Sequence, residues 1–197
     1  MRHLVKRLFC CIHPGFYLML AVMVLTVPFC WILAWILASA IHELGHYAVI
    51  KLCGKHICKI RIDWNGATME TDDLGHVQWL CALAGPVAGF LLLPFYRWIP
   101  RLAVCAFVQS CMNLLPIYPS DGGRILSGIL GFWLPAQIVD RITAITSMLF
   151  IALLAGIVLY GFSQYSARFL IGSCLVVLLV KLRNVRTACK DGRLLVQ

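Results

Sequence analysis

The sequence is poor in charged residues and poorest in acidic ones. Only 13% of its residues are charged, against roughly a quarter in an average soluble domain, and only eight are Asp or Glu. By contrast, 61% are hydrophobic, and the mean hydropathy is +0.88. This balance excludes an ordinary soluble domain and predicts an integral membrane protein that contacts the lipid bilayer.

The chain also lacks internal repeats, low-complexity runs and any appended soluble segment, so we expect a single domain over residues 1–197. Its ten cysteines include no CxxC pair, and several lie in apolar runs, where cysteine behaves as a small hydrophobic side chain. The net charge of +9 is concentrated at the two ends and around residues 51–61. Such clusters indicate membrane topology, and we expect no nucleic-acid partner.

Long apolar runs predict about six transmembrane helices. A bilayer core is crossed by roughly 20 residues, so the run at 15–50 is too long for one helix, and Pro28 is well placed to divide it. The predicted spans lie at about 12–27, 29–51, 77–96, 101–117, 142–161 and 167–182. The alternating pattern at about 57–71 predicts a short β-strand pair at the membrane surface. The expected fold class is an all-α membrane protein with this strand pair.

The positions of the basic residues predict the orientation. An even number of spans places both termini on one side, together with the basic loop after the second span, and the positive-inside rule makes that side the cytoplasm. The basic N-terminus followed by an apolar run imitates a signal peptide. No small-residue cleavage site precedes residue 50, so we expect this segment to be retained.

One short motif in the second predicted span carries the chemistry. His42, Glu43 and His46 form HExxH, and residues four apart lie on one helix face about 6 Å apart along the axis. Two imidazoles suit zinc, and Glu43 can face a water molecule and act as general acid and base. Ionisable groups inside an apolar span cost several kcal/mol unless they pair or bind a ligand, which favours a functional site.

A catalytic zinc usually has a third protein ligand, and Asp121 is the strongest candidate. The other acidic residues lie in the polar loop at 63–73, in the C-terminal tail, or at a span boundary, where Asp140 is next to Arg141. Asp121 stands in a segment with two prolines and two glycines, 113–124. Broken backbone at membrane depth is tolerated only where protein or a water-filled cavity covers it. By the predicted topology, Asp121 lies on the same side as the HExxH motif.

The motifs HELGH and NLLPIYPSDGG, separated by two spans, resemble those of the site-2 protease family of intramembrane zinc proteases. The chain is most similar to the bacterial branch that includes the stage IV sporulation processing protease. The resemblance covers about residues 12–130, the expected catalytic core, with C-terminal helices at about 142–182. Two positions depart from the family pattern: Ser120 replaces a frequent Leu, and Gly89 replaces a frequent Asn.

The resemblance implies a function and a cellular setting. It implies one Zn²⁺ per chain held by His42, His46 and Asp121, with Glu43 as the catalytic residue of a zinc metalloendopeptidase in the bacterial cell membrane. The substrate would be a membrane-bound regulatory protein (a pro-sigma factor, an anti-sigma factor or a tethered transcription factor), cut within or beside its membrane segment. A membrane regulatory partner and a role in sporulation are further implications.

The resemblance also suggests which residues position the substrate. They are Asn113, Pro116, Pro119 and Gly122. The predicted strand pair could add a substrate strand by β-augmentation.

Two other functions stay open at this point. A metal transporter could use the same three ligands as a transit site, but transporters usually have repeated halves, and a transporter needs no Glu43. A catalytically inactive relative could bind and shield membrane segments, but it would more often have lost the acid/base. Both are weaker interpretations than proteolysis.

Overall fold

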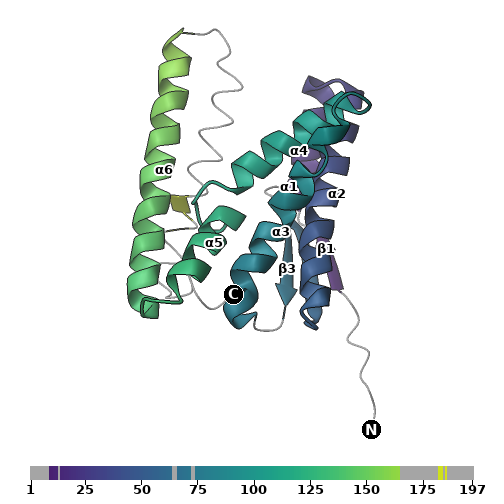
Figure 1. The fold of residues 1–197 in the computed structure, drawn as a ribbon. Helices are drawn as coiled ribbons and strands as arrows, with labels where there is room; N and C mark the ends of the chain where they lie inside the picture. The colour runs from purple at the N-terminus through teal and green to yellow at the C-terminus, as the bar shows by residue number, and fades with distance from the viewer. Residues whose placement is uncertain are drawn as a thin grey trace. The chain divides into compact units, whose positions relative to one another are not determined.

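The computed structural model describes residues 9–12, 14–63, 66–71, 74–164, 182–183 and 185. These residues are mainly helical, which confirms the predicted fold class. The chain divides into two compact units, Met1–Met112 and Asn113–Gln197. Within the described residues, the first unit holds the strands and the helices up to α4, and the second holds α5 and α6 (Figure 1). The single domain stays a prediction.

A small sheet lies in the first unit. Strand β2 (Ile57–Asp63) pairs antiparallel with β3 (Gly66–Thr71), as the alternating pattern predicts. A third strand, β1 (Phe9–Ile12), pairs parallel with β2, so the sheet order is β1-β2-β3. Strand β1 was not predicted from the sequence, and the first span was expected to begin near residue 12. The reason is that a short apolar run has no local signal for a parallel partner so distant in sequence.

Pro28 divides the first long apolar run, as predicted. Helix α1 (Pro14–Thr26) ends before it, and α2 (Phe29–Leu52) begins directly after it. Proline suits this place because it lacks a backbone N–H, and the first N–H groups of a helix have no partner within the helix. At the other end of α2, Gly54 has a φ of 71° and donates to the Lys51 carbonyl. This left-handed conformation, which favours glycine, ends the helix on the C-terminal side of the HExxH motif.

Helix α3 (Gln78–Phe90) follows a short 3₁₀ turn, η1 (Gly75–Val77), and lies beside α2 (Figure 1). The two helices approach closely because Gly45 faces α3. A Cβ added at Gly45 would come 2.5 Å from the Ala84 carbonyl oxygen and 2.8 Å from the Ala88 Cβ. Small residues allow such close approach between membrane helices. The HExxH face of α2 is therefore held directly against the backbone of α3.

A second 3₁₀ turn, η2 (Leu93–Phe95), leads to α4 (Pro100–Asn113), which also packs against α2. Their shared core consists of small side chains: Ala34, Ala38, Cys105 and Ala106. As between α2 and α3, small side chains let two helix backbones come close together.

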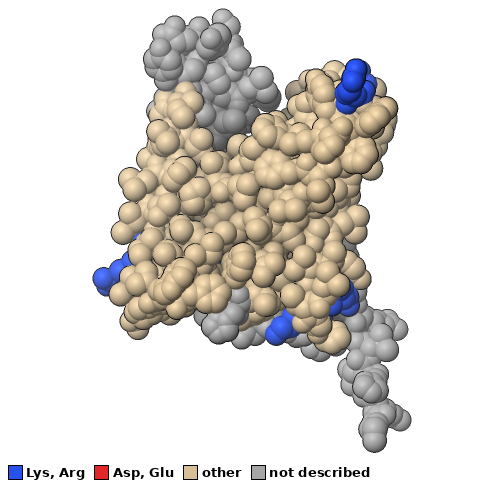
Figure 2. Space-filling model, viewed as in Figure 1, with Lys and Arg blue, Asp and Glu red and all other residues tan. Residues whose placement is uncertain are grey.

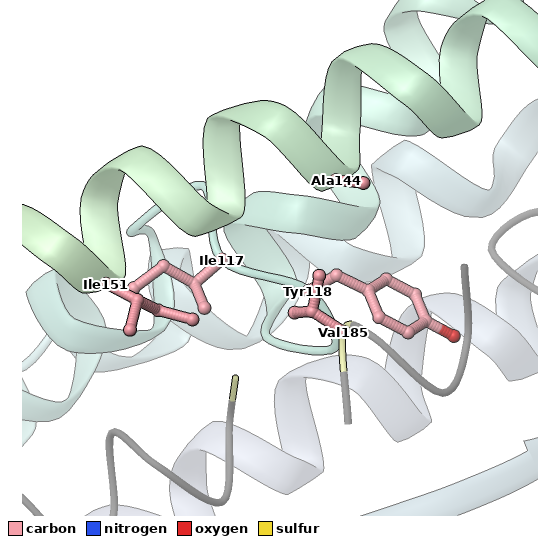
Figure 3. Close-up of a cluster of buried hydrophobic side chains, with 5 residues drawn as sticks. All are labelled: Ile117, Tyr118, Ala144, Ile151 and Val185. Carbon is pink, nitrogen blue, oxygen red and sulfur yellow. The ribbon is translucent and has the colours of Figure 1, made fainter. Parts of the chain in front are cut away.

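In the second unit, residues 114–120 form an irregular segment that leads into α5 (Asp121–Leu130), and α6 (Ala136–Gln164) follows. Ile117 and Tyr118 of that segment are buried against Ala144 and Ile151 of α6 (Figure 3). The segment before Asp121 is thus fixed to α6 by apolar contacts.

Three helical stretches of the described residues are long and apolar enough to cross a membrane: Phe29–Leu52, Gln78–Phe95 and Ala136–Ile157. Many large apolar side chains on these stretches are exposed, including Leu37, Leu80 and Leu153. Side chains other than Lys, Arg, Asp and Glu fill nearly all the described surface in the view of Figure 2. These features support a membrane protein. The total of six spans stays a prediction, and nearly all of the sixth span lies outside the described residues.

Candidate metal centre

The two histidines of HExxH point toward each other on α2. Their Nε2 atoms are 3.1 Å apart, and their rings meet edge to face with centroids 4.8 Å apart. A tetrahedral zinc with Zn–N bonds of about 2.0–2.1 Å separates two ligand nitrogens by roughly 3.3 Å. His42 is buried, whereas His46 and Glu43 are half-buried. The pair therefore has the spacing and partial shielding of a zinc site.

The carbonyl group of Cys81 orients His46. The Nδ1 atom of His46 lies 2.7 Å from the Cys81 carbonyl oxygen, which can only accept a hydrogen bond. Nδ1 must therefore carry the hydrogen, and in the neutral ring Nε2 has a lone pair that faces His42 Nε2. Such a second hydrogen bond is what fixes metal-binding histidines in proteins. Helix α3 thus prepares His46 as a ligand through its backbone.

Gly85 leaves the space that the two imidazoles need. A Cβ added at this buried position would collide with the His46 ring and would come 2.8 Å from His42 Nε2. No other residue type fits there without moving a ring. In the first unit, the imidazoles of His42 and His46 on α2 therefore pack against α3 at Gly85, where no side chain occupies the space.

Gln109 supports the same helix from α4. It is buried, and its amide nitrogen donates to the Trp35 carbonyl at 3.1 Å and to Ser39 Oγ at 2.9 Å. Ser39 lies one turn before His42, so these bonds tie the beginning of the ligand-bearing turn to a second helix.

The remaining predicted site residues belong to the second unit. Asn113 ends α4, and Asp121 begins α5; both side chains are half-buried. Pro116 and Pro119 lie in the irregular segment between them and are half-buried as well. Gly122 is buried, and a Cβ there would collide with the Leu114 and Leu115 carbonyls. These residues thus form one tightly folded turn, and their assigned roles stay predictions.

The chain is similar in sequence to proteins of known name. No family model matches it. It is 29% identical over 167 residues to stage IV sporulation protein FB of Bacillus subtilis, covering 76% of this chain and 57% of that protein. It is 29% identical over 120 residues to a zinc metalloprotease of Methanocaldococcus jannaschii, covering 51% of this chain and 35% of that protein.

A solved structure decides the fold. The chain matches the site-2 protease from Methanocaldococcus jannaschii with a TM-score of 0.64 and 22% identity, covering 90% of this chain and 89% of that one. The chain has the fold of a site-2 protease. With the two sequence relatives, this match confirms the resemblance that the motifs indicate. The chain spans 57% and 35% of the lengths of those two relatives.

The two departures from the site-2 protease pattern have local explanations. Gly89 is buried against α4, where an added Cβ would collide with Ser110 Oγ and lie 3.2 Å from the Ala106 carbonyl oxygen. An Asn would not fit at this position in this chain. Ser120 precedes α5, and its hydroxyl donates to the Ile117 carbonyl. The serine therefore helps to close the turn before Asp121.

Two groups that support the histidine pair, the Gln109 side chain and the Cys81 carbonyl, were not predicted from the sequence. Gln109 could have been found, because an amide inside an apolar span needs a partner. The Cys81 carbonyl could not, because a backbone group leaves no mark in the residue pattern.

Proposed function

We propose that this chain is a zinc metalloprotease of the site-2 type that cuts membrane-bound protein substrates. The observation that carries the proposal is the pair of converging Nε2 atoms, 3.1 Å apart on an apolar helix, with Glu43 between the two histidines. The names of a zinc metalloprotease and a site-2 protease among the similar proteins support the same activity.

His42, His46 and Asp121 are the proposed ligands of one zinc ion. They make up a His-His-Asp group of candidate metal ligands. Two imidazole nitrogens and one carboxylate leave a position open, as catalytic zinc sites require. The orientation of His46 by the Cys81 carbonyl adds the outer hydrogen bond that such sites usually have. When bound, zinc would supply Lewis acidity, which polarises a peptide carbonyl and lowers the pKa of water toward about 7.

Glu43 is the proposed general base and acid. It follows His42 directly on α2 and is half-buried, so it can reach a water molecule near the ligand nitrogens. Its carboxylate would take a proton from the attacking water and deliver it to the leaving amine nitrogen. Proton transfer of this kind contributes about 10²- to 10⁴-fold to a rate.

The proposed substrate is a segment of a membrane-bound regulatory protein, cut within or beside its transmembrane helix. The apolar surface of the spanning helices favours a substrate that shares the bilayer. We further propose a bacterial cell membrane, with the site toward the cytoplasm, a regulatory membrane partner, and substrates of the pro-sigma, anti-sigma or tethered transcription factor type. Asn113 and the turn containing Pro116, Pro119 and Gly122 are the proposed substrate contacts.

The deciding experiment compares new protein N-termini in cells that carry the wild type or Glu43→Gln. The amide keeps the shape of the side chain but cannot take the proton. Asp140→Asn is a matched control, because it makes the same acid-to-amide change on α6 at a residue that is neither a proposed ligand nor a proposed substrate contact. We expect termini in or beside membrane spans that disappear with Glu43→Gln and persist with Asp140→Asn.

Other outcomes have definite meanings. Identical termini in wild type and Glu43→Gln cells, with both proteins zinc-loaded, would refute the proteolytic function. Zinc flux into sealed vesicles that depends on His46 but not on Glu43 would establish the transporter instead.

A further inference from the structure

The turn before Asp121 has very few backbone groups that can hold it in place. In Pro116-Ile117-Tyr118-Pro119 the prolines have no N–H, so only Ile117 and Tyr118 can donate. Ile117 N–H donates within the turn, to the Leu115 carbonyl at 2.7 Å. Tyr118 N–H is therefore the one backbone donor of these four residues that is available to tie the turn to another element.

That donor is paired with Ser147 of α6. Tyr118 N lies 3.0 Å from Ser147 Oγ, and both residues are buried. The serine hydroxyl has one proton, which it donates to the Thr143 carbonyl at 2.6 Å; the Pro116 carbonyl, at 3.5 Å, is too distant to compete. Its lone pairs are thus left to accept from Tyr118. The side chain is held in the acceptor orientation by its own helix.

Apolar contacts reinforce the same attachment. Ala144 and Ile151, three residues before and four after Ser147, pack with Ile117 and Tyr118 (Figure 3). This spacing puts all three α6 residues on one helix face. Gly123 also lies close to the turn, since an added Cβ there would be 2.8 Å from Tyr118 N. The turn is therefore in contact with both α6 and the first turn of α5, which begins with Asp121.

We propose that Ser147 is a positioning residue for Asp121, acting through its hydrogen bond to Tyr118 N–H. This inference rests on the proposed function, in which Asp121 is a zinc ligand. Only two residues, Pro119 and Ser120, separate Tyr118 from Asp121, so a shift of the anchored amide passes to the carboxylate with little loss. Groups that orient a metal ligand typically change metal affinity by about 10- to 100-fold when removed.

Three variants test the proposal. Ser147→Ala removes the acceptor, and Ser147→Cys keeps a weaker acceptor of similar size. Thr143→Val is the matched control. Thr143 is fully buried one turn away on α6, and its Oγ1 has no hydrogen-bond partner among the described residues, so the isosteric change deletes no bond. Two quantities are measured on the purified full chain: hydrogen exchange of the peptide containing Tyr118 without metal, and the zinc dissociation constant by chelator competition.

We expect Ser147→Ala to speed exchange at Tyr118 at least tenfold and to weaken zinc binding about 10- to 100-fold. Ser147→Cys should give intermediate values, and Thr143→Val should match the wild type. A folded Ser147→Ala protein with wild-type zinc affinity overturns the proposal, whatever its exchange rate. If Ser147→Ala does not fold, wild-type values for Ser147→Cys overturn it. A wild type that binds no zinc would refute the proposed function, and the exchange data would still test the anchor.

Discussion

The substitution Gly85→Ala should weaken metal binding while leaving the fold intact. The added methyl group would collide with the His46 ring and approach His42 Nε2 to 2.8 Å, both inside the distances that real Cβ atoms keep. His46 cannot simply turn away, because its Nδ1 donates to Cys81 on the same helix as Gly85. Relief must therefore come from breaking that bond or from rotating His42.

The magnitude follows from the cost of overpacking. One extra carbon in a filled site costs about 1–3 kcal/mol. Without zinc, the imidazole of His42 or His46 can move away from the added methyl group at the cost of its present contacts. With zinc, both imidazoles must stay in place, so the overpacking cost lowers the free energy of zinc binding rather than the stability of the helix packing. At about 1.4 kcal/mol per tenfold change, we expect zinc affinity to fall roughly 5- to 150-fold.

The assay is chelator competition with detergent-solubilised protein, with thermal unfolding measured in parallel. Gly156→Ala is the matched control: it is also a glycine-to-alanine change in an apolar helix, and nothing lies within 4 Å of the added Cβ. It should leave zinc affinity unchanged. If Gly85→Ala bound zinc as tightly as Gly156→Ala, the arrangement of the two imidazoles against α3 would be wrong.

Three further predictions test other parts of the structure. Gln109→Leu removes two hydrogen bonds to α2 and should lower the free energy of unfolding by about 1–2 kcal/mol in a detergent-based unfolding titration; Gln137→Leu, at an exposed position of α6, should have no such effect. Gly54→Ala forces an alanine to a φ of 71° at the end of α2 and should cost about 1 kcal/mol of stability, with zinc affinity unchanged. Removal of zinc with a chelator should abolish substrate cleavage, and restored zinc should return it, whereas Asp121→Ala protein should regain no cleavage at the same zinc concentration. Full recovery of substrate cleavage by Asp121→Ala protein would exclude Asp121 as a zinc ligand.

Much of the fold follows from local patterns in the sequence. Pro28 divided the first apolar run because a missing N–H is tolerated at a helix start, and the alternation at 57–71 predicted two strands because strand side chains alternate between faces. Strand β1 could not be predicted in the same way. Its partner, β2, lies far along the chain, and four apolar residues suit a helix as well as a strand.

By itself, the sequence determined that this is a membrane protein and placed two imidazoles and a carboxylate on one helix. These are consequences of composition and of the spacing i, i+4, which every α-helix converts into a shared face. Only the tertiary structure decided how the site is built. The Cys81 carbonyl that orients His46, the gap at Gly85 and the Ser147 hydroxyl that holds Tyr118 all act between elements distant in sequence. A backbone oxygen, an absent side chain and a common serine have no pattern of their own, so their roles emerge only when packing brings the helices together.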